Sequence, residues 1–476
     1  MPDNYQSVIG EKKPPGKWLV MAAIMLGVFM IPLDTSIVNT VLPTITTYFH
    51  TDISIVQWVP TVYLLAISCL IMLYGRLGDI IGHKKIFLYG LAGFIVSSML
   101  CGLSQNIWLL IVFRVLQGLV AGMPIAVGFA LAVAAFPAEE RGKALGFYAT
   151  SIAVAMALGP TLGGAIAEHL SWRYIFFLNV PIGVVSLIFC SRIIPPSSIR
   201  PGQRLDIPGA LTFFIFLPVL LLYFNRSEEW GWVSPVSLTL LAIAVVLGGL
   251  FFWIERTSKQ PMVNLKIFTE RVFSLATISY FLYFISFSTV LFLTPFYLKF
   301  VLEYSIFEVG LIMASSPVVF MFTAPLSGMA SDRFGTRIFA ISGMCIAALG
   351  LLLLSTLNES DNAFDVVWRL ALTAFGGAIF GTPNNSTIMG SVPPQHLGIA
   401  SGLLAAMRYS GMVFGIAITG AILYGLAPVT ASADPSSFTS ENMGDFMNGL
   451  QWAYIAGAFA AVASALTSTL AIKRRP

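Results

Sequence analysis

Long runs of apolar residues, each of about 20 residues or more, recur along the whole chain between short polar segments. The runs are apolar on every face and do not alternate, so they predict helices that cross the roughly 30 Å hydrocarbon core of a membrane and exclude barrel strands. We expect fourteen such spans, at residues 18–48, 54–74, 86–104, 107–136, 144–168, 173–193, 207–225, 234–254, 272–300, 307–330, 337–357, 364–390, 399–426 and 446–472. The predicted fold class is therefore an all-α polytopic membrane protein.

The composition excludes several other classes. The 476 residues are 57% hydrophobic and 10% charged with a mean hydropathy of +0.85, which is more apolar surface than a soluble core can bury. The net charge of +4 does not indicate nucleic-acid binding, because the basic residues lie in short loops. The sequence has no P-loop, no catalytic Ser-His-Asp order and no metal-ligand cluster, so neither ATP-driven transport nor an enzyme is expected.

The distribution of Lys and Arg predicts the orientation. With the N-terminus inside, three of the 26 lie in outer loops (Arg173, Arg226, Lys299) and three within spans (Arg114, Arg369, Arg408), which leaves 20 on the inner side. Because Lys and Arg accumulate on the cytoplasmic side, both termini are expected there, in the plasma (inner) membrane.

The two ends of the chain repeat one another. The stretch RVLQGLVAG at Arg114 recurs as RLALTAFGG, and the loop GRLGDIIGHKK recurs as GMASDRFGTR with Gly82 aligned to Gly335. This repeat predicts an N-terminal six-helix bundle at 1–194, a two-helix insert with its linkers at 195–270, and a C-terminal six-helix bundle at 271–476. Two parallel halves are typical of transporters with a central site.

Asp34 is the one acid deep inside an apolar span. Inserting an ionisable group at this depth costs roughly 2.5–3.5 kcal/mol, so such a group usually marks an ion or proton pathway. Burial favours the neutral carboxyl and a nearby cation favours the ionised one, so a moving cation can switch its protonation. Arg114, about seven residues or ~11 Å inside the outer end of its span, is the expected partner. The alternative is that both residues are structural, bonded only to neighbouring helices.

Five motifs stand in order at matching spans: LDTSIVNTVLPTI, GRLGDIIGHKK, VFRVLQGLVAG, ALGPTLGGAI and WRYIFFLNVPIG. With them the chain resembles the major facilitator superfamily and, within it, the fourteen-helix drug:proton antiporters of the EmrB/QacA type, over essentially its whole length. The resemblance implies the major facilitator fold, with two pseudo-symmetric six-helix bundles plus two inserted helices. It also implies that Arg114 takes part in proton coupling.

Two of these motifs are expected to control conformation. The loop motif consists of Gly75, Gly78, Asp79, Gly82 and Lys84. Its glycines would permit a tight turn, and Asp79 could accept hydrogen bonds from a helix N-terminus of the other half and so latch the inner gate. The family usually has a basic residue after this aspartate, where this chain has Ile80, which weakens the expected charge network.

The antiporter motif consists of Gly159, Pro160, Gly163 and Gly164. These residues are expected to break the apolar helix, since small residues let helices approach and Pro supplies a bend. The resemblance ties the motif to antiport, and a close-packing seam is the structural alternative.

Polar and aromatic residues of the spans are expected to line a central substrate site: Asn39, Trp58, Tyr63, Asn179, Asn384, Asn385 and Arg408. The alternatives are packing for the aromatic residues and interhelical hydrogen bonds for the polar ones. Arg369, near the outer end of its span, is expected to snorkel and is left out of the site.

The resemblance thus predicts a proton-coupled multidrug exporter of lipophilic neutral or monocationic compounds, driven by the proton gradient without a cofactor. The alternatives are a symporter or exporter of organic anions, fatty acids or lipids, or a sensor. Expected partners are a small lipophilic substrate, protons and the lipid bilayer, with no nucleic acid. A monomer is expected, and a periplasmic adaptor is left open because the outer loops are short, the longest running from about Pro428 to Asp445.

Overall fold

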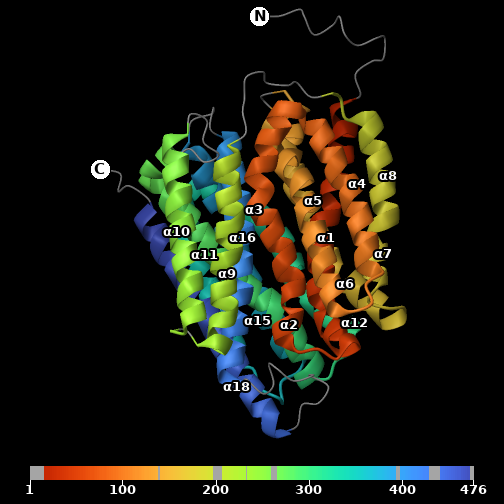
Figure 1. Cartoon of the computed structure of the whole chain (residues 1–476), viewed down its shortest axis with the longest axis vertical. Coiled ribbons are helices and arrows are strands. Elements are labelled where there is room, and N and C mark those ends of the chain that lie inside the picture. The colour runs from red at the N-terminus through yellow and green to blue at the C-terminus, as the bar shows by residue number, and fades with distance from the viewer. Residues whose placement is uncertain are drawn as a thin grey trace, which may run out of the picture.

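The protein is built from membrane-spanning helices. The computed structural model describes residues 16–137, 140–196, 206–231, 233–258, 265–392, 397–427 and 440–471, and within these ranges all regular structure is helical. Fourteen helical segments are long and apolar enough to cross a membrane, which confirms the predicted all-α polytopic fold (Figure 1). A helix satisfies its backbone hydrogen bonds within one segment, as hydrocarbon surroundings require.

The first six spans are α1 (Lys17–Phe49), α2 (Ile53–Val56) with α3 (Trp58–Ile81), α4 (His83–Gly102), α5 (Ile107–Ala134), α6 (Arg141–His169), and α7 (Tyr174–Phe177) with α8 (Asn179–Ile193). Two further spans, α9 (Ile207–Trp230) and α10 (Pro235–Thr257), precede the short η2 (Leu265–Thr269). The last six are α11 (Arg271–Phe296) with η3 (Tyr297–Val301), α12 (Ile306–Met313) with α13 (Ser315–Phe334), α14 (Thr336–Leu354), α15 (Ala363–Gly390), α16 (Leu397–Leu426) and α18 (Ser440–Ala471).

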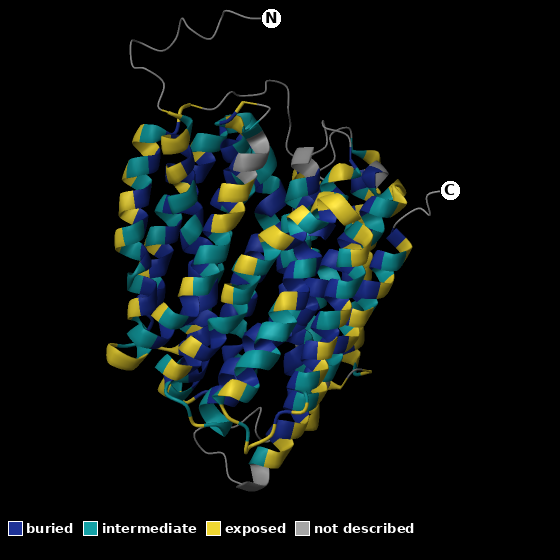
Figure 2. Ribbon diagram, turned by 180° about the vertical axis from the view of Figure 1, so that it is seen from behind, coloured by how far each residue is buried: buried dark blue, intermediate teal, exposed yellow. Residues whose placement is uncertain are grey.

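The ends of α1 define the two ends of the bundle. We call the end where α1 begins the Lys17 end, at the top of Figure 1, and the end where it finishes the Phe49 end, at the bottom. Large apolar side chains stand exposed on the flanks, as contact with lipid tails allows, whereas the interior is buried (Figure 2). On α10, for example, Val245 and Val246 are each 67% exposed.

The sequence repeat reappears in how the helices begin and end. The Asn106 side chain caps α5 by accepting a hydrogen bond from the Leu109 N–H, and Asn362 caps α15 at the repeat-related position. Gly82 and Gly335 end α3 and α13 with φ of +102° and +89°, a backbone conformation that favours glycine. The two halves therefore share local geometry as well as sequence.

Two expectations about glycine motifs are wrong. Helix α3 continues to Ile81, so Gly75 and Gly78 lie inside it and only Gly82 makes the turn. A Cβ on Gly78 would lie 2.8 Å from Val127 of α5, so this glycine serves helix packing. Helix α6 likewise runs without a break through Gly159, Pro160, Gly163 and Gly164, because neighbouring helices accommodate glycine and proline inside a membrane helix.

Several helix pairs join the first and last six spans. Helix α6 packs against α12 and α13, α3 packs against α16, and α1 packs against α11. Helix α9 contacts both α3 and α16, while α10 packs chiefly against α9 in the described part of the chain. The residue bounds expected for three domains, 1–194, 195–270 and 271–476, stay a prediction.

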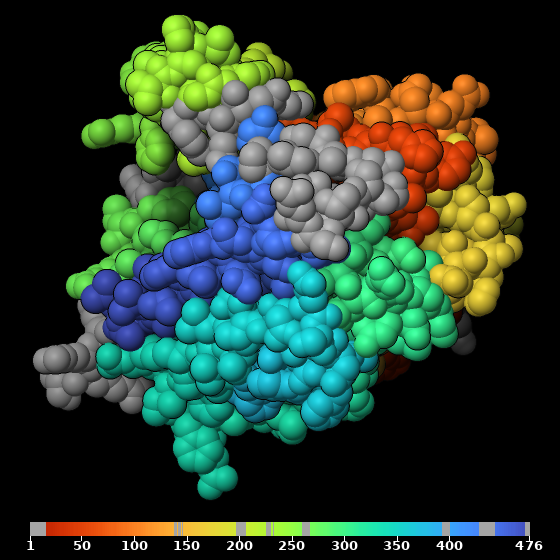
Figure 3. All heavy atoms as spheres, turned by 90° about the horizontal axis from the view of Figure 1, so that it is seen from below, coloured from red at the N-terminus to blue at the C-terminus, as the bar shows by residue number. Residues whose placement is uncertain are grey.

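The two halves meet closely at the Phe49 end. A Cβ on Gly164 of α6 would lie 2.5 Å from the Ile306 carbonyl oxygen of α12, and one on Gly310 would lie 2.3 Å from the Pro160 carbonyl oxygen. The Ile306 N–H also donates to the Glu168 carboxylate, over 3.1 Å. Figure 3 looks onto this end and shows the green α12 region beside the red and yellow helices of the first half.

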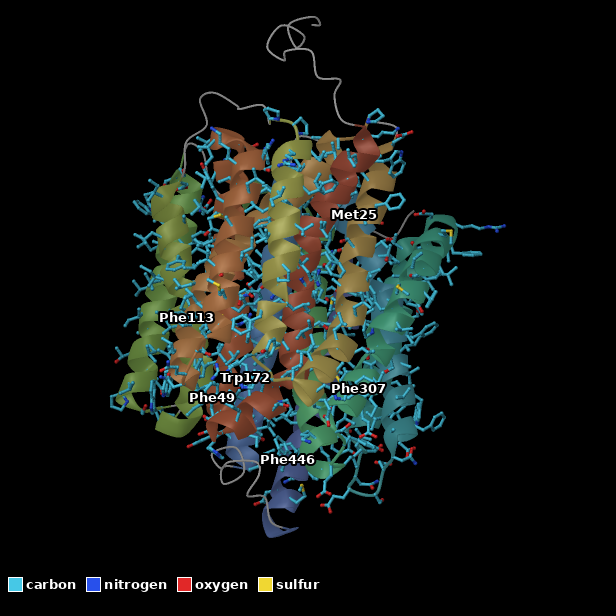
Figure 4. The ribbon with its side chains drawn as sticks, turned by 90° about the vertical axis from the view of Figure 1, so that its right-hand side faces the viewer. Met25, Phe49, Phe113, Trp172, Phe307 and Phe446 are labelled. Carbon is cyan, nitrogen blue, oxygen red and sulfur yellow. The ribbon has the colours of Figure 1, made fainter. Side chains whose placement is uncertain are left out.

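Toward the Lys17 end, α6 loses this contact. Gly146 precedes Gly164 by about five helical turns, so the two glycines share one face of α6. Among the described residues, a Cβ on Gly146 would have no atom within 4 Å. The helices therefore diverge from a tight seam at the Phe49 end, where Figure 4 labels Phe49, Trp172 and Phe307, toward the Lys17 end, nearer Met25.

We predict that Gly164→Ala prevents tight closure of the Phe49 end, because its methyl group would meet a backbone carbonyl that has little room to move. Overpacking of this kind costs about 1–3 kcal/mol, which corresponds to a shift of roughly 5- to 150-fold away from the closed form. The measurement is the labelling rate of Ile306→Cys, in a background without the native cysteines, by an impermeant maleimide. Gly146→Ala on the same face is the control and should label like the parent; equal rates in all three proteins would contradict the prediction.

Candidate functional site

A buried ion pair lies at the middle of the first six spans. Asp34 of α1 is 1% exposed and Arg114 of α5 is fully buried, and Asp34 Oδ2 lies 2.6 Å from Arg114 Nη1. Both side chains are removed from water, so the two charges have little solvent to stabilise them. The structure thus brings together the acid and the base that the sequence singled out.

Neutral polar side chains complete the surroundings of this pair. Asp34 Oδ1 accepts hydrogen bonds from Asn179 Nδ2 of α8 at 3.0 Å and from Gln117 Nε2 at 3.3 Å. Gln117 Oε1 accepts from Arg114 Nη1 at 2.7 Å. Ser98 Oγ of α4 accepts from both Asn179 and Gln117. We call these five residues the Asp34 network: Asp34, Ser98, Arg114, Gln117 and Asn179.

The rest of the Arg114 guanidinium contacts α3 and α7. Its Nε donates to the Val59 carbonyl at 3.2 Å, and its Cζ lies 3.9 Å from the centre of the Tyr63 ring and 5.8 Å from that of Phe176. An arginine over an aromatic face gains a cation–π interaction that strengthens when both are desolvated. Its Nη2 has no hydrogen-bond partner among the described residues, so the N–H groups of this nitrogen have no acceptor there.

This arrangement makes the charge of Asp34 consequential. A proton on Asp34 would remove the negative charge and leave Arg114 as an uncompensated buried cation, which is strongly unfavourable. Either the cation or its surroundings would then have to move. Because the network draws on α1, α4, α5 and α8, such a rearrangement would shift helices rather than one side chain.

The sequence analysis assigned some residues of this site to a different group. Tyr63 and Asn179, expected as substrate contacts, lie against the ion pair instead. Gln117 and Ser98 were missed. Gln117 could have been found, because it lies three residues after Arg114 on the same helical face and is polar within an apolar run. Ser98 gives no such signal.

The antiporter motif packs directly beside this site. A Cβ on Gly159 would lie 2.5 Å from the Ser36 side chain, and one on Gly163 would lie 3.1 Å from Ile37, both on α1 just after Asp34. Ser36 Oγ donates to the Met156 carbonyl of α6 at 3.0 Å. Gly164 faces α12 instead, so one short stretch of α6 contacts both the helix of Asp34 and the other half.

A second group surrounds Arg408 of α16. Arg408 Nη2 lies 3.6 Å from the Met156 sulfur of α6, and its Cζ lies 5.2 Å from the centre of the Phe284 ring of α11. Its Nε is buried without a hydrogen-bond partner in the described part of the chain. Arg408 therefore lies between the two halves, and Met156 connects its surroundings to Ser36.

The described contacts of the other expected substrate residues differ from one residue to the next. Asn39 donates within its own helix, to the Thr35 carbonyl at 2.7 Å, and Asn384 of α15 donates to the Ala276 carbonyl of α11 at 3.1 Å. Trp58 and Asn385 are half-buried. Asn39 and Asn384 thus form helix and interhelix bonds, as the structural alternative expected.

The described contacts of the loop motif lie within the first half. Asp79 Oδ1 is 3.7 Å from His83 Nε2, and Lys84 Nζ donates to the Ser191 carbonyl of α8 at 2.8 Å. The latch from Asp79 to the other half stays a prediction.

Arg369 reaches an acid at the end of its span, and whether it snorkels stays a prediction. It pairs with Asp361 at 3.6 Å, with both side chains 12% exposed, and its Cζ lies 5.2 Å from the Trp368 ring. Asp361 precedes α15 in sequence, so the partner comes from the adjoining loop. Among the described residues no three His, Cys, Asp or Glu side chains form a group suited to a metal ion.

Comparison with known proteins gives one family throughout. The family model described as Major Facilitator Superfamily matches residues 24–416 and 276–476. The chain is 30% identical to the riboflavin transporter RibZ of Clostridioides difficile, covering 84% of this chain and 87% of that protein. It is 32% identical to the multidrug resistance protein Stp of Mycobacterium tuberculosis, covering 88% and 77%.

Among solved structures, the chain is similar in fold to a bacterial homolog of the lysosomal transporter Spinster in an inward-facing, unoccupied conformation. The TM-score is 0.68 at 15% identity, covering 96% of this chain and 98% of that one.

We predict that Asp34 and Arg114 are strongly coupled in stability. Asp34→Asn or Arg114→Gln alone should cost about 3–5 kcal/mol, because each leaves an uncompensated buried charge, and the double variant should cost clearly less than their sum. The measurement is the free energy of unfolding of the purified protein. Asp361→Asn with Arg369→Gln is the matched control, and its coupling should be smaller because those charges are farther apart and partly exposed. Additive effects at Asp34 and Arg114 would contradict the prediction.

Proposed function

Because the chain belongs to the Major Facilitator Superfamily, we propose that it is a proton-coupled efflux transporter of the fourteen-helix drug:proton (EmrB/QacA) type. It exports small lipophilic compounds by alternating access. Its similarity to a multidrug resistance protein supports export, and its similarity to a riboflavin transporter supports a small organic cargo.

The ion pair between Asp34 and Arg114 carries this proposal. It is buried, its two atoms lie 2.6 Å apart, and protonation of Asp34 would break its charge balance. A site of this kind can exist in two states, with Asp34 ionised against Arg114 or with Asp34 neutral and Arg114 rearranged. Exchange between them is the form that proton coupling would take.

Helix α6 connects this site to the gate. Gly159 and Gly163 let α6 lie against α1 beside Asp34, and Gly164 lets the same helix lie against α12 of the other half. A rearrangement at Asp34 that displaces α1 would therefore be passed to the seam at the Phe49 end. This physical continuity supports a role for the antiporter motif in coupling.

These contacts support the following transport cycle. The Phe49 end faces outside, and its tight seam corresponds to a state open to the cytoplasm. When that seam opens, a proton from outside neutralises Asp34 and the cargo leaves. Return to the inward-facing state releases the proton into the cytoplasm and admits new cargo.

The remaining features of the proposal come from the sequence. The protein lies in the plasma membrane with both termini in the cytoplasm, as the excess of inner Lys and Arg favours. The proton gradient alone drives it, without a cofactor, and it works as a monomer. From the sequence we expect a neutral or monocationic cargo. The residues around Arg408 would influence which cargo charge the protein prefers.

We predict that cargo addition releases protons from everted membrane vesicles that hold a proton gradient, and that Asp34→Asn abolishes this release. The amide cannot take up and give back a proton at this position. The measurement is the recovery of fluorescence of a pH-sensitive dye after adding anionic, neutral and cationic lipophilic compounds, ethidium among them.

Asp361→Asn is the control, because it removes an acid paired with arginine from outside the spans. It should release protons like the parent protein. Equal release by the parent and Asp34→Asn would rule out Asp34 as the proton carrier, and no release with any compound would overturn proton-coupled export.

A further inference from the structure

Arg408 differs from the other two arginines within the spans in having no carboxylate partner. Arg114 pairs with Asp34 and Arg369 with Asp361, whereas no carboxylate of the described residues lies within 4.0 Å of Arg408. An intramembrane cation is costly to hold and is usually paired or placed on a substrate path. Its positive charge thus lacks compensation within the described part of the protein.

Arg408 also lacks the contacts of a structural arginine. Arg114 donates to the Val59 backbone carbonyl, whereas among the described residues Arg408 has one polar contact, the Met156 sulfur, a weak acceptor at 3.6 Å. Its buried Nε has no hydrogen-bond partner within the same residues. The guanidinium therefore keeps donors in the planar arrangement that suits a carboxylate.

Aromatic side chains surround this cation. Its Cζ lies 5.2 Å from the Phe284 ring centre and 5.8 Å from that of Tyr409. The Tyr280 and Tyr283 rings lie 4.9 and 4.8 Å from Phe284. Flat apolar surfaces thus adjoin a single positive charge.

The position of Arg408 suits a substrate contact. It lies between α16 and α6, so elements of both halves meet there. Met156 comes between Gly164, where the halves touch closely, and Gly146, where they do not. Since the Met156 carbonyl also accepts from Ser36, two residues after Asp34, Arg408 lies at about the depth of the ion pair.

We propose that Arg408 and the aromatic side chains around it bind a planar aromatic monoanion, such as an arene carboxylate. The guanidinium pairs with the anionic group, and the Phe284 and Tyr409 rings lie against the aromatic system. This proposal names the cargo class of the proposed exporter and rests on that function for its transport role. A monocationic cargo would meet an unpaired arginine without a nearby carboxylate, so this differs from the charge that the sequence led us to expect.

A matched series of probes tests the charge preference directly. The full-length protein in nanodiscs of zwitterionic lipid is titrated, without a proton gradient, with pyrene that carries a carboxylate, a hydroxymethyl or a trimethylammonium group. Binding is read as fluorescence anisotropy against empty nanodiscs. We expect the carboxylate to bind at least about tenfold more tightly than the alcohol, and the ammonium compound to bind weakest, because a charge-assisted bidentate pair is stronger than a neutral hydrogen bond.

Two variants separate recognition from structure. Arg408→Gln should bring the carboxylate down to the affinity of the alcohol and leave the alcohol unchanged, and Arg408→Lys should keep part of the preference because it keeps the charge without the planar fork. Equal or tighter binding of the ammonium compound by the parent protein would overturn the proposal. So would binding of none of the three probes, a carboxylate preference that survives Arg408→Gln, or an equal loss for all three.

The vesicle experiment tests the proposed function independently of the Arg408 site. Binding here needs no gradient, so an anion preference without proton release in vesicles would retain the Arg408 site and discard proton-coupled export. Proton release together with a preference for the ammonium probe would do the reverse.

Discussion

A carboxylate and a guanidinium that share an apolar interior cannot be stabilised independently, and this constraint shapes the first half of the protein. Asp34 and Arg114 lie in contact because each charge would otherwise be uncompensated. Asn179, Gln117 and Ser98 are then needed to satisfy the remaining oxygens and amide groups. Three helices consequently meet at one carboxylate, a fourth joins through Ser98, and the protonation state of Asp34 bears on how they pack.

Small residues determine where the halves can touch. Glycines of α6 let that helix lie against α1 beside Asp34 and against α12 across the seam. On α12, Gly310 allows an equally close approach to α6. The face that is tightly packed at Gly164 has no neighbour at Gly146. One helix thus belongs at once to the charged site and to the contact that closes one end of the bundle.

The sequence predicted the fold and the ion pair because membranes make charge rare and apolar runs long. It was wrong about Gly75 and Gly78, since a glycine in sequence does not tell whether it makes a turn or gives room to a neighbouring helix. It did not predict that Tyr63 and Asn179 contact the ion pair, because the direction of each side chain depends on how its helix is rotated. The sequence also could not predict which arginines have a carboxylate partner. The pairing of Arg369 with Asp361, and the absence of such a partner for Arg408 among the described residues, depend on contacts across loops or between helices.

Among the described residues no carboxylate lies within 4.0 Å of Arg408, which has an energetic consequence for the proposed transport cycle. If one proton enters for each monoanion that leaves, each movement makes the cytoplasm more positive by one elementary charge. Two elementary charges therefore cross the membrane per cycle. Each is worth about 2.3 kcal/mol per 100 mV of membrane potential. A monocation exchanged for one proton would move no net charge and draw on the pH difference alone. The charge of the cargo that Arg408 binds would thus decide whether the membrane voltage can drive export.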